Sequence, residues 1–356
     1  MKIGYLVHDM DSKAGWGRLS SDLISGIREN GHEVTILKEI DDGFEGLPLL
    51  RRGVGMFSSA FHARKYLRNC DVIHAIDVYP YGIIATLATL GLRKKIVISL
   101  IGTYSVAPLY NLRTSLLSRM SLHAAVAVTS ISEFTKREVY KKVRLRDVIT
   151  ITPGIDLEVF HKEHVESNEQ FIISVGALKE RKGYHISIPA FALARQEITS
   201  LKYKIIGNQG DSSYFSELKR LAREYGVEDA VQFLTNIPDD ELSNLYKEAK
   251  LFLLPSVNAG HHFEGFGIVF LEAAAAGLPV IGTWGNGIEE AVQNDQNGFL
   301  IAQNDIAGTS KAILEIVRNP ERWREMSARS YSWADENDLD GMIKNMQVMY
   351  DKIIKS

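Results

Sequence analysis

The sequence predicts an α/β protein built from two doubly wound parallel sheets. Short apolar, β-branched runs alternate with helical patterns along the whole chain, and these runs fall into two successive sets of six. Runs that are apolar on both faces indicate strands buried on both sides and joined by right-handed crossovers. A chain of 356 residues is long enough for two such domains, each with its own core.

The expected strands follow in chain order. In the first half they lie at 2–8, 33–37, 71–76, 95–100, 125–128 and 148–151. In the second half they lie at 171–175, 203–206, 231–233, 251–255, 280–283 and 298–301. The predicted domains are 1–160 and 166–334, with the link inside the polar stretch 156–169. A last helix, at about 335–356, carries an apolar stripe at helical spacing. This stripe must pack against one of the two domains.

The composition excludes several classes of protein. Apolar residues make up 45% of the chain and charged residues 24%, which rules out a disordered or low-complexity sequence. The single cysteine, Cys70, permits neither an intramolecular disulfide nor a thiolate cluster for zinc. The longest apolar stretch, 78–92, is shorter than the ~20 residues that cross a bilayer, and no signal-peptide core follows Met1. We therefore expect a cytoplasmic protein.

Charge is distributed unevenly between the two halves. Residues 1–165 carry 22 Lys and Arg against 17 Asp and Glu, while residues 166–356 carry 19 against 27. Two groups contribute to the basic half: Arg51, Arg52, Arg64, Lys65 and Arg68, and Lys136, Arg137, Lys141, Lys142, Arg144 and Arg146. They are either solvated helix faces or a surface that attracts anionic lipid head groups or an acidic acceptor.

The most informative motif is the stretch 262–279, whose predicted helix contains a single charge, Glu272. A buried carboxylate needs a partner, because burying it alone is costly. Ribose hydroxyls would serve, and a structural ion pair is the alternative. Glu264 lies eight positions earlier, beside Gly265 and Gly267, which let the backbone approach a ligand. Free amides at the start of a helix can hold phosphate, so the pattern predicts a site for a sugar diphosphate.

A second glycine-containing loop follows the first strand of the second half. Gly176 opens this loop, and Lys179, Arg181 and Lys182 follow. The carboxyl end of a parallel strand is where such sheets bind ligands, and cations there would neutralise a leaving diphosphate. A solvated turn is the alternative interpretation.

The first strand of the chain runs into a loop with Gly15 and Gly17, which would approach phosphates from the opposite side of a cleft. The spacing Gly-x-Gly-x-x-Ser is a weak dinucleotide fingerprint. Asp9 and Asp11 form an Asp-x-Asp pattern, but no third carboxylate is near them in the sequence. We therefore expect no metal site.

With these motifs in place, the chain resembles, over nearly its whole length, the retaining glycosyltransferases of family 4, which have the GT-B fold. The matching segments are Gly31-His32-Glu33-Val34, Asp71-Val72-Ile73-His74, Thr152-Pro153-Gly154-Ile155-Asp156 with Phe160, the Gly176 loop, Glu264 to Pro279, and Gly287-Ile288-Glu289 with Asn297-Gly298. The resemblance implies two facing Rossmann-like domains. The first would hold the acceptor and the second the donor, and the last helix would cross back to the first.

The resemblance also implies roles for single residues. Glu264 would contact the transferred sugar, Glu272 the ribose hydroxyls and Lys182 the diphosphate. Arg181 would replace a family cation that is missing at Ala177. Further donor-binding positions are Gly265, Phe266, Gly267, Ile268, Gly15, Gly17, Gly176 and Ile237.

On the acceptor side the chain departs from the family. A His-Gly pair is common where this chain has Ile101-Gly102. His74, Tyr104 and His8 are the candidates for taking over the lost contact.

The implied reaction is metal-independent, retaining transfer of a sugar from a UDP-, GDP- or ADP-sugar to an acceptor hydroxyl, in glycan, glycolipid or cell-envelope polysaccharide synthesis. No cofactor besides the donor and no nucleic acid are expected, and the basic first half favours a lipid-linked or anionic acceptor and contact with the inner face of the membrane. The alternatives are a nucleotide-sugar-binding protein without turnover, a nucleotide-sugar epimerase and a glycan phosphorylase. A dehydrogenase is disfavoured, because the glycine loop is poor and Glu39 is only a loose candidate for the ribose acid.

Overall fold

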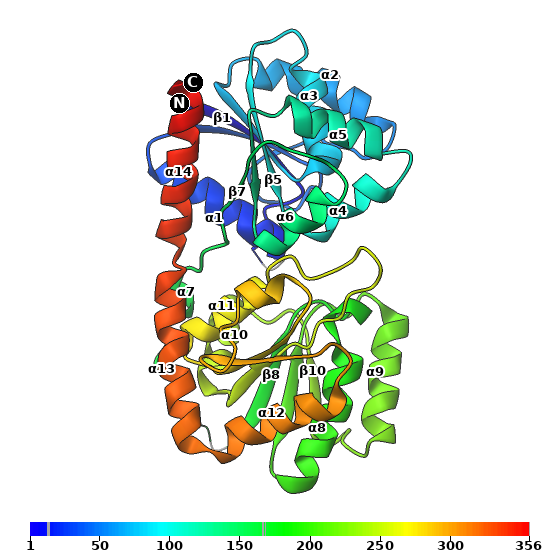
Figure 1. Ribbon diagram of the computed structural model, residues 1–356, viewed down its shortest axis with the longest axis vertical. Coiled ribbons are helices and arrows are strands. Elements are labelled where there is room, and N and C mark those ends of the chain that lie inside the picture. Colours follow the sequence, from blue (N-terminus) through cyan, green and yellow to red (C-terminus); the bar gives the residue numbers. More distant parts are fainter. Residues whose placement is uncertain (13–14, 166, 168, 356) are drawn as a thin grey trace. The chain divides into compact units, whose positions relative to one another are not determined.

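The computed structural model describes residues 1–12, 15–165, 167 and 169–355. They form two compact units (Figure 1): unit 1 is Met1–Pro153 with Leu339–Ser356, and unit 2 is Gly154–Asp338. Each unit is an α/β domain around one parallel sheet, as the sequence predicts.

Unit 1 contains a seven-stranded sheet in the order β3-β2-β1-β4-β5-β6-β7, with every neighbouring pair parallel. Its strands are β1 Lys2–Val7, β2 Glu33–Lys38, β3 Leu47–Pro48, β4 Val72–Ile76, β5 Lys95–Leu100, β6 Ala127–Ser130 and β7 Val148–Thr150. All five residues of β4 are buried. Helices therefore cover both faces of this sheet, as its apolar strands require.

The helices of unit 1 divide between those two faces. They are α1 Gly15–Glu29, α2 Gly55–Leu67, the π-helical turn η1 Val78–Gly82, α3 Ile83–Ala88, α4 Thr103–Tyr110, α5 Ser115–Ala124, α6 Glu133–Tyr140 and α14 Leu339–Lys355. Helices α1 and α14 pack against each other, while α3 contacts both α2 and α5 (Figure 1).

Unit 2 contains a six-stranded parallel sheet in the order β10-β9-β8-β11-β12-β13. Its strands are β8 Phe171–Val175, β9 Lys202–Ile206, β10 Val231–Leu234, β11 Leu251–Leu253, β12 Val280–Thr283 and β13 Gly298–Ile301. Its helices are α7 Leu157–Phe160, η2 Glu180–Lys182, α8 Tyr184–Glu197, α9 Ser212–Glu224, α10 Asp239–Glu248, α11 Ile268–Ala275, η3 Gly287–Glu290, α12 Ile306–Arg318 and α13 Pro320–Glu336.

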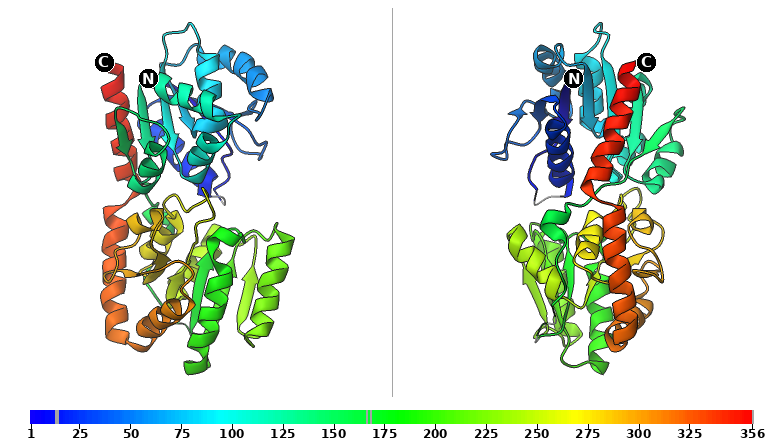
Figure 2. Two further views of the ribbon diagram at one scale, coloured as in Figure 1. Left: turned by 45° about the vertical axis from the view of Figure 1, so that its right-hand side comes forward. Right: turned by 90° about the vertical axis from the view of Figure 1, so that its left-hand side faces the viewer.

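The last helix, α14, completes the core of unit 1 (Figure 2). Its apolar stripe packs against β1 and α1 and includes Met342, Ile343, Met346, Met349, Tyr350 and Ile353. The hydroxyl of Tyr350 lies 3.0 Å from that of Tyr5 on β1. Residues at the two ends of the chain thus form one hydrophobic core, which stabilises the unit through burial of apolar surface.

The strands differ from the expectation in two places. The two-residue edge strand β3 was not predicted, because so short a pairing leaves no periodic signal in the sequence. The strand expected at 125–128 occupies Ala127–Ser130 instead, since Ala125 caps the end of α5. The remaining strands agree within two residues at each end.

The chain passes from unit 1 to unit 2 between Pro153 and Gly154, before the polar stretch 156–169. Most of that stretch belongs to unit 2, where Ser243 of α10 donates a hydrogen bond to the carbonyl of Val159. Glu166 and Asn168 lie outside the described residues. No helix among the described residues is long and apolar enough to span a bilayer.

Candidate active site

Three charged side chains meet in unit 2, between η2 and the loop before α11. The ammonium of Lys182 lies 2.7 Å from Oε2 of Glu264, and a guanidinium nitrogen of Arg181 lies 2.8 Å from the same oxygen. Exposed fractions of the side chains are 10% for Lys182, 25% for Arg181 and 13% for Glu264. Burial alone would raise the pKa of Glu264, but the two cations lower it to about 2. The trio therefore carries a net positive charge at neutral pH, which suits an anionic ligand.

The loop carrying the two cations is fixed by a close backbone approach. Gly183 has φ of +74°, and a Cβ on it would lie 1.9 Å from the carbonyl oxygen of Pro255. The N–H of Val257 donates to the carbonyl of Arg181 at 2.8 Å. Glycine at position 183 is therefore what lets the loop after β8 lie against the segment after β11.

The loop carrying Glu264 is held by η3. The N–H of Gly287 donates to the carbonyl of Glu264 at 2.9 Å, and a Cβ on Gly287 would lie 2.0 Å from the carbonyl oxygen of Gly265. Gly176 has φ of +151°, and a Cβ there would lie 3.4 Å from Cε of Lys182. The predicted residues Gly176, Lys182, Arg181, Glu264 and Gly265 are thus brought together.

Glu272 is 3% exposed on α11. The hydroxyl of Tyr246, from α10, donates to its Oε2 at 3.0 Å. Helix α11 begins at Ile268, after Gly267 at φ of +88°, and Phe266 is buried beside it. The first N–H groups of a helix have no partner within the helix, so the predicted donor-side amides stand at a helix start.

In unit 1, three aromatic rings stack beyond the carboxyl ends of β1 and β5. The ring of Trp16 stacks on that of His8, with centroids 4.7 Å apart, and on that of Tyr104, at 4.8 Å. Tyr104 is 40% exposed. Within the described part of the chain, the indole N–H of Trp16 is buried without a hydrogen-bond partner. Stacked, partly exposed aromatic rings with polar tips are suited to contact a sugar or another amphipathic ligand.

His8 also belongs to a polar network. Its Nδ1 lies 3.1 Å from Oε2 of Glu39 and 3.0 Å from the hydroxyl of Tyr81, and Arg52 donates to Oε1 of Glu39 at 2.7 Å. Burial would raise the pKa of Glu39, but its hydrogen bonds lower it to about 2. Glu39 is therefore paired within unit 1, which argues against a role as a ribose acid.

Asp77 ties together the loops after β4 and β5. Its Oδ1 accepts from the N–H of Val78 and from the hydroxyl of Ser105, each at 2.6 Å. The oxygen of Ser105 accepts from the N–H of Ile101 at 2.8 Å. Burial raises the pKa of Asp77 to about 7. This chain of hydrogen bonds positions the backbone from which Tyr104 projects.

The structure separates His74 from the other acceptor-side candidates. Its side chain is fully buried, and its two ring nitrogens lie at hydrogen-bond distance from the hydroxyls of Tyr350 and Ser99. Burial lowers the pKa of His74 to about 3. This burial argues against a substrate contact at His74, because Tyr350 of α14 covers the side chain.

Gly15 and Gly17 form the first turn of α1, and not a loop as expected. A Cβ on Gly17 would lie 2.0 Å from Oδ1 of Asp9, so this position packs closely against the end of β1. Lys13 and Ala14 lie outside the described residues. The part of the chain that the structure describes contains no group of three or more His, Cys, Asp and Glu with a geometry for metal binding.

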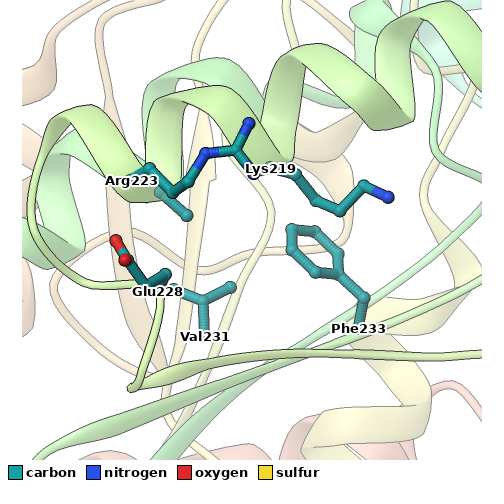
Figure 3. Close-up of a pocket in the computed structure, with 6 residues that line it drawn as sticks. Lys219, Arg223, Glu228, Val231 and Phe233 are labelled. Atoms are coloured by element: carbon teal, nitrogen blue, oxygen red, sulfur yellow. The ribbon is translucent and has the colours of Figure 1, made fainter.

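Ile237 is half-buried in the loop between β10 and α10. A hollow of about 310 Å³ lies between α9 and β10 of unit 2 (Figure 3). Its lining consists of Lys219, Ala222, Arg223, Glu228, Val231 and Phe233. In Figure 3 the two basic side chains of α9 face the apolar side chains of β10. None of the charged trio lines this hollow, so we do not assign it to the active site.

Sequence reasoning missed Tyr246, Asp77 and Trp16 as members of these sites. Trp16 had a signal, since it is a large aromatic residue between Gly15 and Gly17 in the motif that follows the first strand. Tyr246 and Asp77 had none, because each contact joins segments that are distant along the chain.

Two family models match the chain. The model described as Glycosyltransferase Family 4 matches residues 14–159, and the one described as Glycosyl transferases group 1 matches residues 156–333. N-acetyl-alpha-D-glucosaminyl L-malate synthase of Bacillus anthracis is 28% identical over 274 residues, which cover 74% of this chain and 69% of that protein. A GDP-mannose-dependent alpha-(1-6)-phosphatidylinositol monomannoside mannosyltransferase of Mycolicibacterium smegmatis is 27% identical over 286 residues, 74% of this chain and 73% of that protein.

Among solved structures, HepE of Anabaena in complex with UDP-glucose superposes with a TM-score of 0.83. Its sequence identity is 18%, and the match covers 99% of this chain and 100% of that one. At this sequence identity the structural similarity shows the fold alone. The two family models, in contrast, together span nearly the whole chain. The chain therefore belongs to glycosyltransferase family 4 and has the GT-B fold.

Proposed function

We propose that the protein is a retaining glycosyltransferase that moves a sugar from a nucleotide diphosphate sugar to an acceptor hydroxyl. The observation that carries the proposal is the partly buried trio of Lys182, Arg181 and Glu264 in unit 2. Because two cations contact one carboxylate, a net positive charge remains to bind a diphosphate. The carboxylate can accept hydrogen bonds from sugar hydroxyls.

The chemistry needs a stabilised leaving group. In the proposed step, the bond between the anomeric carbon and the diphosphate oxygen breaks, and the acceptor oxygen bonds to the same face of that carbon. The acceptor proton passes to the departing phosphate oxygen, so atoms and charge balance. Lys182, Arg181 and the amides at the start of α11 would hold the negative charge that develops on the diphosphate. Glu264 would position the sugar and would not form a covalent intermediate.

Glu272 would bind the ribose hydroxyls. A carboxylate accepts two hydrogen bonds from a vicinal diol, and the Tyr246 hydroxyl at 3.0 Å orients the carboxylate from its other side. We propose a UDP-, GDP- or ADP-sugar as the donor, with Ile237 near the base. No metal is required in this scheme, because protein cations and helix amides supply the charge.

Unit 1 would bind the acceptor. The stack of His8, Trp16 and Tyr104 offers aromatic surface and polar tips, the combination with which proteins hold amphipathic groups. We propose a glycan or lipid-linked acceptor in cell-envelope, glycolipid or polysaccharide synthesis. The protein would act in the cytoplasm, in peripheral contact with the inner face of the membrane.

One experiment separates this function from its alternatives. The purified protein is first screened by thermal shift against nucleotide sugars, and the stabilising donor is then incubated with and without candidate acceptors. A transferase releases nucleotide diphosphate only when acceptor is present. Binding without release would indicate a binding protein without turnover, and an isomerised donor formed without acceptor would indicate an epimerase.

A further inference from the structure

Unit 1 exposes large apolar side chains on one face. Val54, at the N-cap of α2, and Phe57 and Phe61 within it are 90%, 56% and 78% exposed, and they follow one another at spacings of three and four residues. Such spacings place side chains on the same side of a helix. Leu116 and Met120, 68% and 57% exposed, repeat this pattern on α5.

These two stripes lie on helices on either side of α3, which contacts both α2 and α5 (Figure 1). Arg64 of α2 donates hydrogen bonds of 2.9 and 2.8 Å to the carbonyls of Ala88 and Leu90, at the end of α3. Leu90 is itself 61% exposed. We call this face the α2–α5 surface, and it consists of Val54, Phe57, Phe61, Leu90, Leu112, Leu116 and Met120.

The charges around this surface have one sign. Residues 46–132 contain ten Lys and Arg but only two acids, Asp71 and Asp77, and Asp77 is fully buried. The exposed cations include Arg51, Lys65, Arg68, Arg93, Arg113 and Arg119. A soluble protein rarely leaves so many large apolar side chains exposed on one face without a partner.

The second basic group, at 136–146, differs in this respect. Its Lys136 and Lys141 are paired with Glu133 and Glu138 at 3.0 and 2.5 Å, and Lys142 lies over the ring of Tyr110. Lys136 and Lys141 are partly neutralised by these acids, so these two cations attract anions less strongly.

A second copy of the chain fits the α2–α5 surface poorly. A symmetric dimer through this face would bring two sets of unpaired cations together, which is repulsive. An anionic lipid surface meets both features at once, since head groups attract the cations and the acyl region takes up apolar side chains.

We propose that the α2–α5 surface docks the enzyme on a bilayer that contains anionic lipid. This inference rests on the membrane contact included in the proposed function, and it names the residues and the lipid chemistry. Phe57 and Phe61 insert below the head groups, while Arg113 and Arg119 bind lipid phosphate.

The test is co-sedimentation of the full chain with vesicles of phosphatidylcholine, alone or mixed with phosphatidylglycerol. We expect binding to the mixed vesicles only, with an affinity that falls as salt rises. Phe57→Ser with Phe61→Ser should weaken binding at least ~10-fold, because two aromatic side chains lose their apolar environment. Arg113→Ala with Arg119→Ala should weaken it by about five-fold for each charge removed.

Matched controls remove the same side-chain types from other surfaces of the chain. Val348→Ser with Ile354→Ser removes two exposed apolar residues of α14, and Arg144→Ala with Arg146→Ala removes two exposed cations. Both should bind the mixed vesicles as the parent does. Loss of binding in either control, or full binding by both surface variants, would overturn the proposal.

A dimer is distinguished by sedimentation velocity without lipid. A parent that is dimeric and becomes monomeric with Phe57→Ser and Phe61→Ser would assign the surface to self-association and overturn lipid docking.

The thermal shift with donor is measured on every variant and should be unchanged. A parent that binds donor but not vesicles refutes the docking alone, whereas one that binds vesicles but neither binds nor turns over any donor refutes the proposed reaction.

Discussion

Lys182 and Glu264 form a buried ion pair, with the ammonium 2.7 Å from the carboxylate oxygen that Arg181 also contacts. Each residue comes from a different loop of unit 2, and each loop is held by a glycine that permits close backbone approach. The contacts with Glu264 orient the two cations before any donor arrives. Preorganised charge of this kind accounts for a large share of catalysis in transfer reactions.

Removing the Lys182 cation should slow transfer. For Lys182→Ala we expect turnover to fall about 10²- to 10³-fold, the usual cost of losing one donor that stabilises developing charge. Lys182→Arg keeps the charge and should retain more activity than the alanine variant. Initial rates of nucleotide release with donor and acceptor measure both. Equal rates for the parent and Lys182→Ala would contradict a role at the diphosphate.

The lowered pKa of Glu264 predicts a pH-dependent stability. With a folded-state pKa of about 2, this carboxylate stabilises the protein above its unfolded pKa of roughly 4.3, by on the order of 3 kcal/mol. That contribution is lost as pH falls through the folded pKa. Urea unfolding of the parent and Glu264→Gln should therefore differ most at pH 7 and converge toward pH 3. A difference that stays constant with pH would exclude the ion pair as its source.

The two glutamates should contact different parts of the donor, Glu272 the nucleotide and Glu264 the sugar. Glu272→Ala should weaken binding of the free nucleotide diphosphate and of the nucleotide sugar alike, by about ten-fold or more, because hydrogen bonds to a charged group are lost. Glu264→Ala should weaken the nucleotide sugar more than the free nucleotide diphosphate, because only the sugar contact is lost directly. Calorimetric titrations with both ligands measure the two effects. Tyr246→Phe removes a single hydrogen bond to Glu272 and serves as the milder comparison.

Tyr104 should act on the acceptor and not on the donor. Tyr104→Ala removes the exposed end of the aromatic stack, so we expect a higher KM for the acceptor, by about ten-fold, with an unchanged donor thermal shift. Tyr225→Ala in unit 2 removes a tyrosine of similar exposure, 46% against 40%, and should leave both unchanged. An acceptor KM that is unaffected in Tyr104→Ala would remove the stack from the acceptor site.

Transfer should survive removal of divalent metal. Because protein cations hold the diphosphate in the proposed scheme, chelator should leave the turnover rate within about two-fold of its value. Rates are compared in chelator and in added magnesium or manganese. Complete loss in chelator, restored by either metal, would show that a metal supplies the charge.

The sequence by itself determined the two parallel sheets and the loops that carry Lys182, Arg181 and Glu264. Strand periodicity is local, and parallel strands bring their carboxyl ends to one edge of a sheet, so these loops could be assigned without coordinates. The acidic partner of the two cations was not predicted to be Glu264 itself. Their pairing joins positions about eighty residues apart, and no local pattern encodes it.

The tertiary structure decided which polar residues face a ligand. His74 and Tyr104 were equal candidates in the sequence, yet Tyr350 of the last helix covers His74. A hydrogen bond from Ser105 to Asp77 holds α4, on which Tyr104 is exposed. Exposure depends on which elements cover a position, and that is set by contacts between distant segments. For the same reason the two basic groups looked alike in the sequence. Only the fold showed that the α2–α5 surface combines its cations with exposed apolar side chains.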